Sequence, residues 1–250
     1  MDWKEMVEIQ DTYLEFGKEM LRKHGALSGV TFAISHKDLL PKDASTLRMQ
    51  SVDGEADLEC KDGVENVIVA APVPNTPLEF CGAIIKLAPE AVASTVRTAI
   101  ELAKACGVWE ADPQGACEKI LNGVKASTGM DDKDLQTRLL MAFLEKVGAY
   151  AYVHMDEAWT VAASNADALK AINAARTQSL ADHPDRQECI VSMLVSRTRQ
   201  RAVTLPFTRD ENNNPVIGEP MVHETDSSEG FKVSGRLTEL LPEVDPTALN

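Results

Sequence analysis

The segment from Ala149 to Val161 constrains the fold most, because its side chains alternate in character along an uninterrupted run. Successive side chains of a strand point to opposite faces of a sheet. One face would carry Ala151, Val153, Met155, Glu157, Trp159 and Val161, and the other Tyr150, Tyr152, His154, Asp156, Ala158 and Thr160. The pattern predicts a strand whose apolar face packs under helices and whose aromatic and polar face is partly open.

Short apolar runs bounded by turn-forming residues predict the other strands. They lie at 30–34, 67–71, 189–196, 202–207 and 216–217, with a weaker candidate at 49–52. The last three main runs are joined by short connections at 199–200 and 212–214. Such spacing is typical of an antiparallel meander.

Helical spacing of apolar residues predicts helices between these strands. The predicted helices span 3–21, 89–106, 112–125, 131–147 and 164–176, and the run 80–87 fits either a strand or a helix. We therefore predict an α+β fold with a mixed, mainly antiparallel sheet and several helices packed on it. A single domain would cover 1–225, with peripheral insertions at 36–65 and 164–182 and a polar tail at 226–250.

The charge of the chain bears on its partners and its location. The formal net charge is -14, from 39 acidic and 25 basic residues, and such a field repels polyanions. Broad nucleic-acid binding is therefore not expected. The sequence has neither a run of about 18 apolar residues nor a recognisable signal segment, which predicts a cytoplasmic protein without a membrane span.

The five cysteines are widely spaced, odd in number and without a C-x-x-C pair. This pattern argues against a disulfide framework and against a zinc site, and it predicts reduced thiols. The residues are Cys60, Cys81, Cys106, Cys117 and Cys189. No cofactor can be named from the sequence.

The best catalytic candidates are His154, Asp156 and Glu157 on the alternating strand, with His183 as a second imidazole. An imidazole and a carboxylate two residues apart on one strand could share a proton, a water molecule or a divalent metal. The alternative is that His154 and Asp156 are solvated polar residues. Glu157 would then pair with an arginine of the next strand, for which Arg186 is the candidate.

A basic cluster interrupts the acidic sequence near the predicted meander. Arg197, Arg199 and Arg201 flank its first turn, and Arg209 ends the following strand. With Tyr152 on the polar face, they are the candidate ligand-binding residues, for a small phosphorylated ligand or an acidic partner. The alternative is a charged hairpin tip that protects an edge strand from aggregation.

The E-A-W segment at 157–159, followed by H-P-D-R-Q-E at 183–188 and an antiparallel pair, resembles a group of small bacterial proteins without assigned function. The resemblance covers about residues 132–219. This chain departs from the group in its longer middle region and in the helix predicted between the two motif halves. The resemblance implies an α+β fold and supplies no catalytic residues.

The sequence lacks the G-x-x-x-x-G-K-[ST], G-x-G-x-x-G, H-E-x-x-H and G-x-S-x-G motifs. The function it favours is that of a non-catalytic, protein-binding or regulatory protein. The alternative is a hydrolase or nuclease-like enzyme built around His154 and Asp156. If the chain is a protein-binding or regulatory protein, its expected ligand is a partner protein. Both hypotheses remain open at this point.

Overall fold

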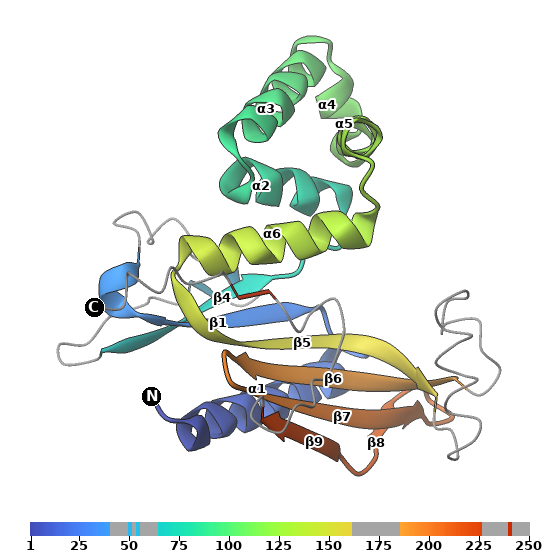
Figure 1. Cartoon of the computed structure of the whole chain (residues 1–250). Coiled ribbons are helices and arrows are strands. Elements are labelled where there is room, and N and C mark those ends of the chain that lie inside the picture. Colours follow the sequence, from blue (N-terminus) through green and yellow to red (C-terminus); the bar gives the residue numbers. More distant parts are fainter. Residues whose placement is uncertain (41–49, 52–53, 56–64, 162–185, 227–239, 242–250) are drawn as a thin grey trace. The chain divides into compact units, whose positions relative to one another are not determined.

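The computed structural model describes residues 1–40, 50–51, 54–55, 65–161, 186–226 and 240–241 (Figure 1). The chain divides into two compact units. Unit 1 comprises Met1–Val30 and Val153–Val233, and unit 2 comprises Thr31–Tyr152 and Ser234–Asn250. Helices and antiparallel strands are both extensive, and the α+β prediction is confirmed. The predicted helix at 164–176 and His183 lie outside the described residues.

Unit 1 is an antiparallel sheet with one long helix on it. Its strands are the second part of β5 (Ala149–Val161), then β6 (Arg186–Ser196), β7 (Arg199–Arg209), β8 (Pro215–Ile217) and β9 (Met221–Asp226). Strand β6 pairs with β7 from Glu188↔Phe207 to Val195↔Gln200, and β7 pairs with β8 from Phe207↔Ile217 to Arg209↔Pro215. The predicted antiparallel meander is therefore confirmed.

Strand β9 is an addition to the predicted strands, the last of which was 216–217. It pairs with β7 on the same edge as β8, from Thr204↔Met221 to Arg199↔Asp226. Between the two short strands, the Gly218 amide donates to the Pro206 carbonyl over 2.8 Å. The sequence does not predict β9, because its side chains are largely exposed and show no strand pattern. The strand forms through backbone pairing with β7.

Helix α1 (Trp3–His24) covers one face of this sheet. Asp2 caps its N-terminus in a capping box with Glu5, and Gly25 ends it with a φ of 72°. The side of α1 that faces the sheet is buried and consists of Met6, Gln10, Leu14, Gly17 and Leu21. The absence of a side chain at Gly17 makes room for Met155, whose Sδ would lie 2.6 Å from a Cβ there.

Unit 2 combines a second part of the sheet with a group of helices. Its strands are β1 (Val30–His36), β4 (Asn66–Pro72) and the first residues of β5, in the order β4-β1-β5, and a separate two-stranded sheet pairs β2 (Gln50–Ser51) with β3 (Gly54–Glu55). The helices are η1 (Lys37–Leu39), α2 (Pro77–Leu87), α3 (Glu90–Ala105), α4 (Val108–Ala111), α5 (Pro113–Thr128) and α6 (Asp132–Lys146).

The ambiguous run at 80–87 is part of helix α2. A capping box of Thr76 and Glu79, with Pro77 in the first turn, starts this helix before the apolar run begins. Helices α2, α3, α5 and α6 then share one apolar core, against which the partly buried Trp109 of α4 packs. The core consists of Cys81, Ile84, Val96, Ile100, Cys117, Leu121, Val124, Leu135 and Leu139. Among the helices of the described chain, none is long and apolar enough to cross a membrane.

Candidate functional site

The polar row of β5 is more enclosed than its sequence suggests. Segment 149–161 is a strand, as predicted. However, Tyr152 is 0% and His154 is 2% exposed, so the prediction that this face is partly open is wrong at both positions. Burial lowers the pKa of His154 to about 4. The imidazole is therefore neutral at neutral pH and withdrawn from solvent.

Asp156 follows on the same face and is only partly buried. Its carboxyl group lies against Gly29, where a Cβ would be 2.9 Å from the carboxyl carbon. Burial raises the pKa of Asp156 to about 6, the Glu157 charge adds to this increase, and a 2.8 Å hydrogen bond from the Glu157 amide opposes it. Asp156 can thus exchange a proton near pH 6, whereas the buried His154 is charged only in stronger acid.

Glu157 lies on the opposite face of β5 and belongs to an ionic network. Its Oε2 accepts from the Leu27 amide over 3.0 Å, and its Oε1 lies 3.7 Å from Nη2 of Arg209. Arg209 also forms a pair with Glu188 and donates to the Gly25 carbonyl over 2.9 Å. The network joins the C-terminal end of α1 to β5, β6 and β7.

Two predictions about Glu157 need correction. Its arginine partner comes from β7, which is not the neighbouring strand, and it is Arg209. Arg186 stacks instead over the Trp159 ring, with its Cζ 4.9 Å from the ring centroid. The reason is the length of the arginine side chain, which lets Arg209 reach past β6 at the end of the sheet.

The arginines predicted to form one basic cluster lie at two ends of β7. Arg199 pairs with Glu224 over 2.8 Å and with Asp226 over 3.6 Å, and its Cζ is 5.0 Å from the centroid of the Trp3 ring. Arg201 pairs with Asp11 over 2.8 Å. Arg209 belongs to the Glu157 network at the far end, and Arg197 lies in the β6–β7 turn. Most of the predicted phosphate ligands are thus engaged by carboxylates.

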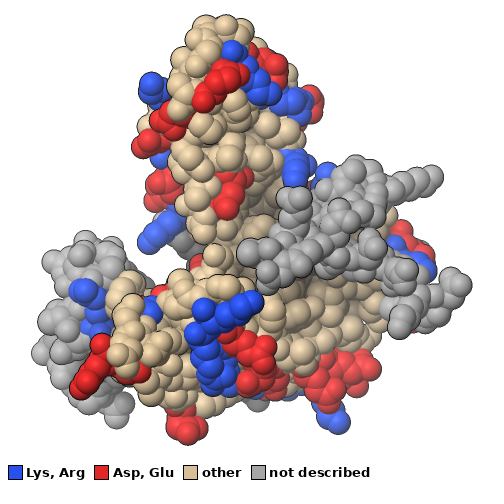
Figure 2. Space-filling view, turned by 180° about the vertical axis from the view of Figure 1, so that it is seen from behind, with Lys and Arg blue, Asp and Glu red and all other residues tan. Residues whose placement is uncertain are grey.

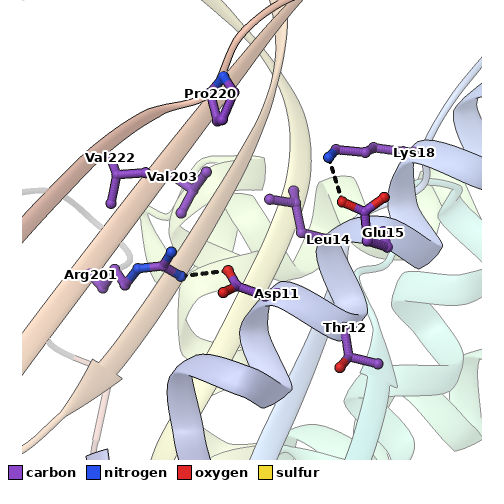
Figure 3. Close-up of a pocket in the computed structure, with 9 residues that line it drawn as sticks. All are labelled: Asp11, Thr12, Leu14, Glu15, Lys18, Arg201, Val203, Pro220 and Val222. Carbon is purple, nitrogen blue, oxygen red and sulfur yellow. Dashed lines mark hydrogen bonds and ion pairs between the residues drawn. The ribbon is translucent and has the colours of Figure 1, made fainter. Parts of the chain in front are cut away.

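A groove lies beside α1 over the edge of the unit 1 sheet, and Arg201 is the candidate ligand-binding residue from the sequence that lines it (Figure 3). We call it the α1–β9 groove. Its volume is about 460 Å³, and it is lined by Asp11, Thr12, Leu14, Glu15, Lys18, Arg201, Val203, Pro220 and Val222. Val203 and Val222 are directly paired across β7 and β9, and Leu14 points toward them from the helix. The floor of the groove is therefore apolar.

The rim of the α1–β9 groove is acidic because of how its two ion pairs are oriented. In the first pair, the side chain of Asp11 is 52% exposed and that of Arg201 only 12%. In the second pair, which spans 2.5 Å, Glu15 is 66% and Lys18 17% exposed. Each pair thus presents its carboxylate to solvent and withdraws its cation.

The opposite rim of the groove is strand β9, which pairs with β7 and with no other strand of the described chain. Its residues Met221 to Glu224 are exposed, and Val222 is 48% exposed although it lines the groove. Sequence reasoning singled out Arg201 for ligand binding but missed the rest of this site, because β9 was not expected. For β9 itself, the Met221–Val222 pair directly after Pro220 was the available signal, and it is too short to identify a strand.

Other candidate features add no further site. Within the described ranges, no group of three or more His, Cys, Asp or Glu side chains is placed to hold a metal ion. On the face drawn in Figure 2, Lys and Arg lie in small groups beside Asp and Glu rather than in one broad basic field. No protein-family model matches the chain, and no curated protein or solved structure is significantly similar to it.

Proposed function

We propose that this chain is a protein-binding module that holds a segment of another protein, with apolar and basic side chains, in the α1–β9 groove. The observation that carries the proposal is the groove itself, an apolar floor of Leu14, Val203 and Val222 under a rim of exposed carboxylates. Of these three side chains, Val222 is 48% exposed and the other two are buried beneath it. An accessible apolar side chain in a concave site is typical of protein recognition surfaces.

The charge distribution favours a basic partner both through the groups at the groove and through the net charge of the whole chain. Near the groove, the exposed groups of both ion pairs are Asp11 and Glu15, and Glu219 stands exposed beside Pro220. Over a longer range, the net charge of -14 attracts cationic segments and repels acidic ones. Charge complementarity thus supplies the orientation and the encounter rate, and the apolar floor supplies the buried contact area.

The enzymatic alternative has weaker support. The imidazole of His154 is 2% exposed, so a substrate would have no direct access to it in this conformation. The second imidazole of that hypothesis, His183, lies outside the described residues. The predicted site for a phosphorylated ligand is likewise weakened, because Arg199, Arg201 and Arg209 already pair with carboxylates.

A selection with random twelve-residue peptides displayed on phage tests the binding function. We expect the full chain to enrich peptides in which apolar residues accompany Lys or Arg. Val222→Lys should weaken the enriched peptides at least about tenfold, because it places a cation on the groove floor and in the path of their basic residues. Val222 is already 48% exposed, so the substitution should leave the melting temperature nearly unchanged.

The matched control is Val216→Lys. Val216 is 54% exposed on β8, pairs with the same strand β7, and does not line the groove. The Val216→Lys variant should bind the enriched peptides with the same affinity as the parent chain. The proposal is refuted if the selection yields no peptide whose binding Val222→Lys weakens more than Val216→Lys does.

A further inference from the structure

We infer that the partner segment binds as an added β-strand, pairing its backbone with the edge of β9 that no strand of the described residues occupies, while alternate side chains enter the α1–β9 groove. This inference rests on the proposed function and specifies how the same groove recognises its ligand. The occupant is an extended segment of another protein in which apolar and basic residues occur together. Its backbone supplies hydrogen bonds, and its side chains supply selectivity.

The backbone of β9 has the geometry that strand addition requires. All six of its residues, Met221 to Asp226, pair with β7, so the strand is fully extended and in register. In an antiparallel ladder, half of the amide and carbonyl groups of an edge strand point away from its partner. On β9, these groups form the outer edge of the sheet within the described chain.

The side chains of β9 fit the same arrangement. Val222 lines the groove, and Glu224 and Asp226 follow on the same face, where Arg199 contacts both carboxylates. A strand added beside β9 would direct every second side chain to this face. It would meet the apolar floor at Val222 and carboxylates farther along the strand.

The acidic residues of β9 also decide between a foreign segment and a second copy of this chain. Two β9 strands paired with each other would bring together two sets of Glu224 and Asp226, in chains that each carry a net charge of -14. Like charges on adjacent strands destabilise pairing. A segment with Lys or Arg at alternate positions avoids this repulsion, beside carboxylates that Arg199 already partly neutralises.

Backbone methylation of a synthetic peptide tests strand addition directly. The probe is a dye-labelled nine-residue peptide whose alternate side chains are two valines followed by three lysines, with threonines between them, and its binding to the full chain is measured by fluorescence anisotropy. In a bound strand, alternate amides face β9 and the intervening amides face solvent. We therefore expect N-methylation of one alternate set to weaken binding at least about tenfold, and methylation of the other set to change it less than about threefold.

Charge variants test the chemistry of the occupant. The double variant D11N/E15Q removes the exposed rim carboxylates and should weaken the valine–lysine peptide at least about fivefold. The control E90Q/E101Q removes two exposed, ion-paired carboxylates from α3 in unit 2, with the same change in net charge. It should bind the peptide within about twofold of the parent chain.

The outcomes separate this inference from the proposed function. Equal effects of the two methylation sets, or no binding of the valine–lysine peptide, would overturn strand addition. Groove-dependent peptides from the phage selection would still support the binding function in that case. Dimerisation through β9, detected by sedimentation of the parent chain and lost in Val222→Lys, would overturn the choice of a foreign segment.

Discussion

Arg209 and Glu188 form a two-pronged ion pair, with Nε of the arginine 3.0 Å from Oε2 and Nη2 3.0 Å from Oε1 of the glutamate. The hydrogen bonds to Glu188 raise the pKa of Arg209 further above its usual range. The pair joins the beginning of β6 to the end of β7, and the Gly25 carbonyl binds the remaining guanidinium nitrogen. The arginine expected to bind a ligand therefore holds α1 to the sheet.

Replacement of Arg209 should destabilise unit 1. We expect Arg209→Ala to lower the free energy of unfolding by about 2 kcal/mol, because Glu188 and the Gly25 carbonyl lose a charged donor in a half-buried site. Arg209→Lys should lose about 1 kcal/mol, since an ammonium group cannot form the two-pronged pair. Urea denaturation measures both.

The control for Arg209 is Arg97→Ala on α3, which removes an ion pair with the exposed Glu90. Its loss should stay below about 0.5 kcal/mol, because pairs between exposed side chains contribute little. Equal stability of Arg209→Ala and Arg97→Ala would contradict a structural role for Arg209.

The sequence predicted the elements that carry a clear local signal and missed strand β9, which does not. Helices α1 and α6 carry N-terminal caps and regular apolar stripes, and both were predicted to within a few residues. Strand β5 was recognised from its alternation. Strand β9 has mostly exposed residues, and it forms because it pairs with β7. A local sequence pattern does not contain that pairing.

The candidate site was less predictable than the fold for the same reason. The carboxylates of Asp11 and Glu15 look like ordinary residues of a solvated helix face. Only the fold places them over Val203 and Val222, which come from segments about two hundred residues later. Likewise, alternation along β5 could not reveal that its polar face is closed at His154.

Gln10 should be the most costly polar position of α1 to lose. Its side chain is 0% exposed, donates to the Ser192 carbonyl and hydroxyl over 3.1 Å each, and accepts from Nη1 of Arg201 over 2.6 Å. Gln10→Ala leaves these groups without their partner, and we expect a loss of about 3 kcal/mol in urea denaturation. Thr12→Ala, at an exposed position two residues later, should change stability by less than about 0.5 kcal/mol.

The thiols should differ strongly in reactivity. Burial raises the pKa of Cys81 to about 12 and that of Cys189 to about 11, whereas Cys106 is exposed at the end of α3. Because the thiolate is the reactive form, iodoacetamide at pH 8 should label Cys106 at least about a hundredfold faster than Cys81 or Cys189. Peptide mass spectrometry gives the rate at each cysteine. In 8 M urea the three cysteines should be labelled at comparable rates. Comparable rates in the folded chain would contradict the burial of Cys81 and Cys189.

Asp156 should destabilise the folded chain at neutral pH. Its folded pKa of about 6 lies above the ordinary value of 3.8, so the folded state binds the proton more tightly than the unfolded state. The contribution of this group to stability therefore falls as the pH rises from about 4 to about 6. Asp156→Asn should be more stable than the parent chain at pH 7.5, by about 2 kcal/mol, and the difference should shrink toward pH 4. Urea denaturation across this range would refute the assignment if the difference were independent of pH.

The titration of His154 should change stability with pH in the opposite direction to that of Asp156, over an overlapping pH range. Its folded pKa of about 4 lies below the ordinary value of 6.5, so on acidification the unfolded state takes up a proton before the folded state does. Stability should consequently fall as the pH drops from about 6.5 to about 4, by roughly 3 kcal/mol for this group alone. In the parent chain, Asp156 partly offsets this loss.

The Asp156→Asn variant should therefore show the steeper acid dependence, and adding His154→Gln to it should remove most of that slope. His223→Gln, at an exposed position on β9, should keep the slope of the Asp156→Asn background. If His154→Gln left the slope as steep as His223→Gln does, the buried imidazole would not be the group that titrates.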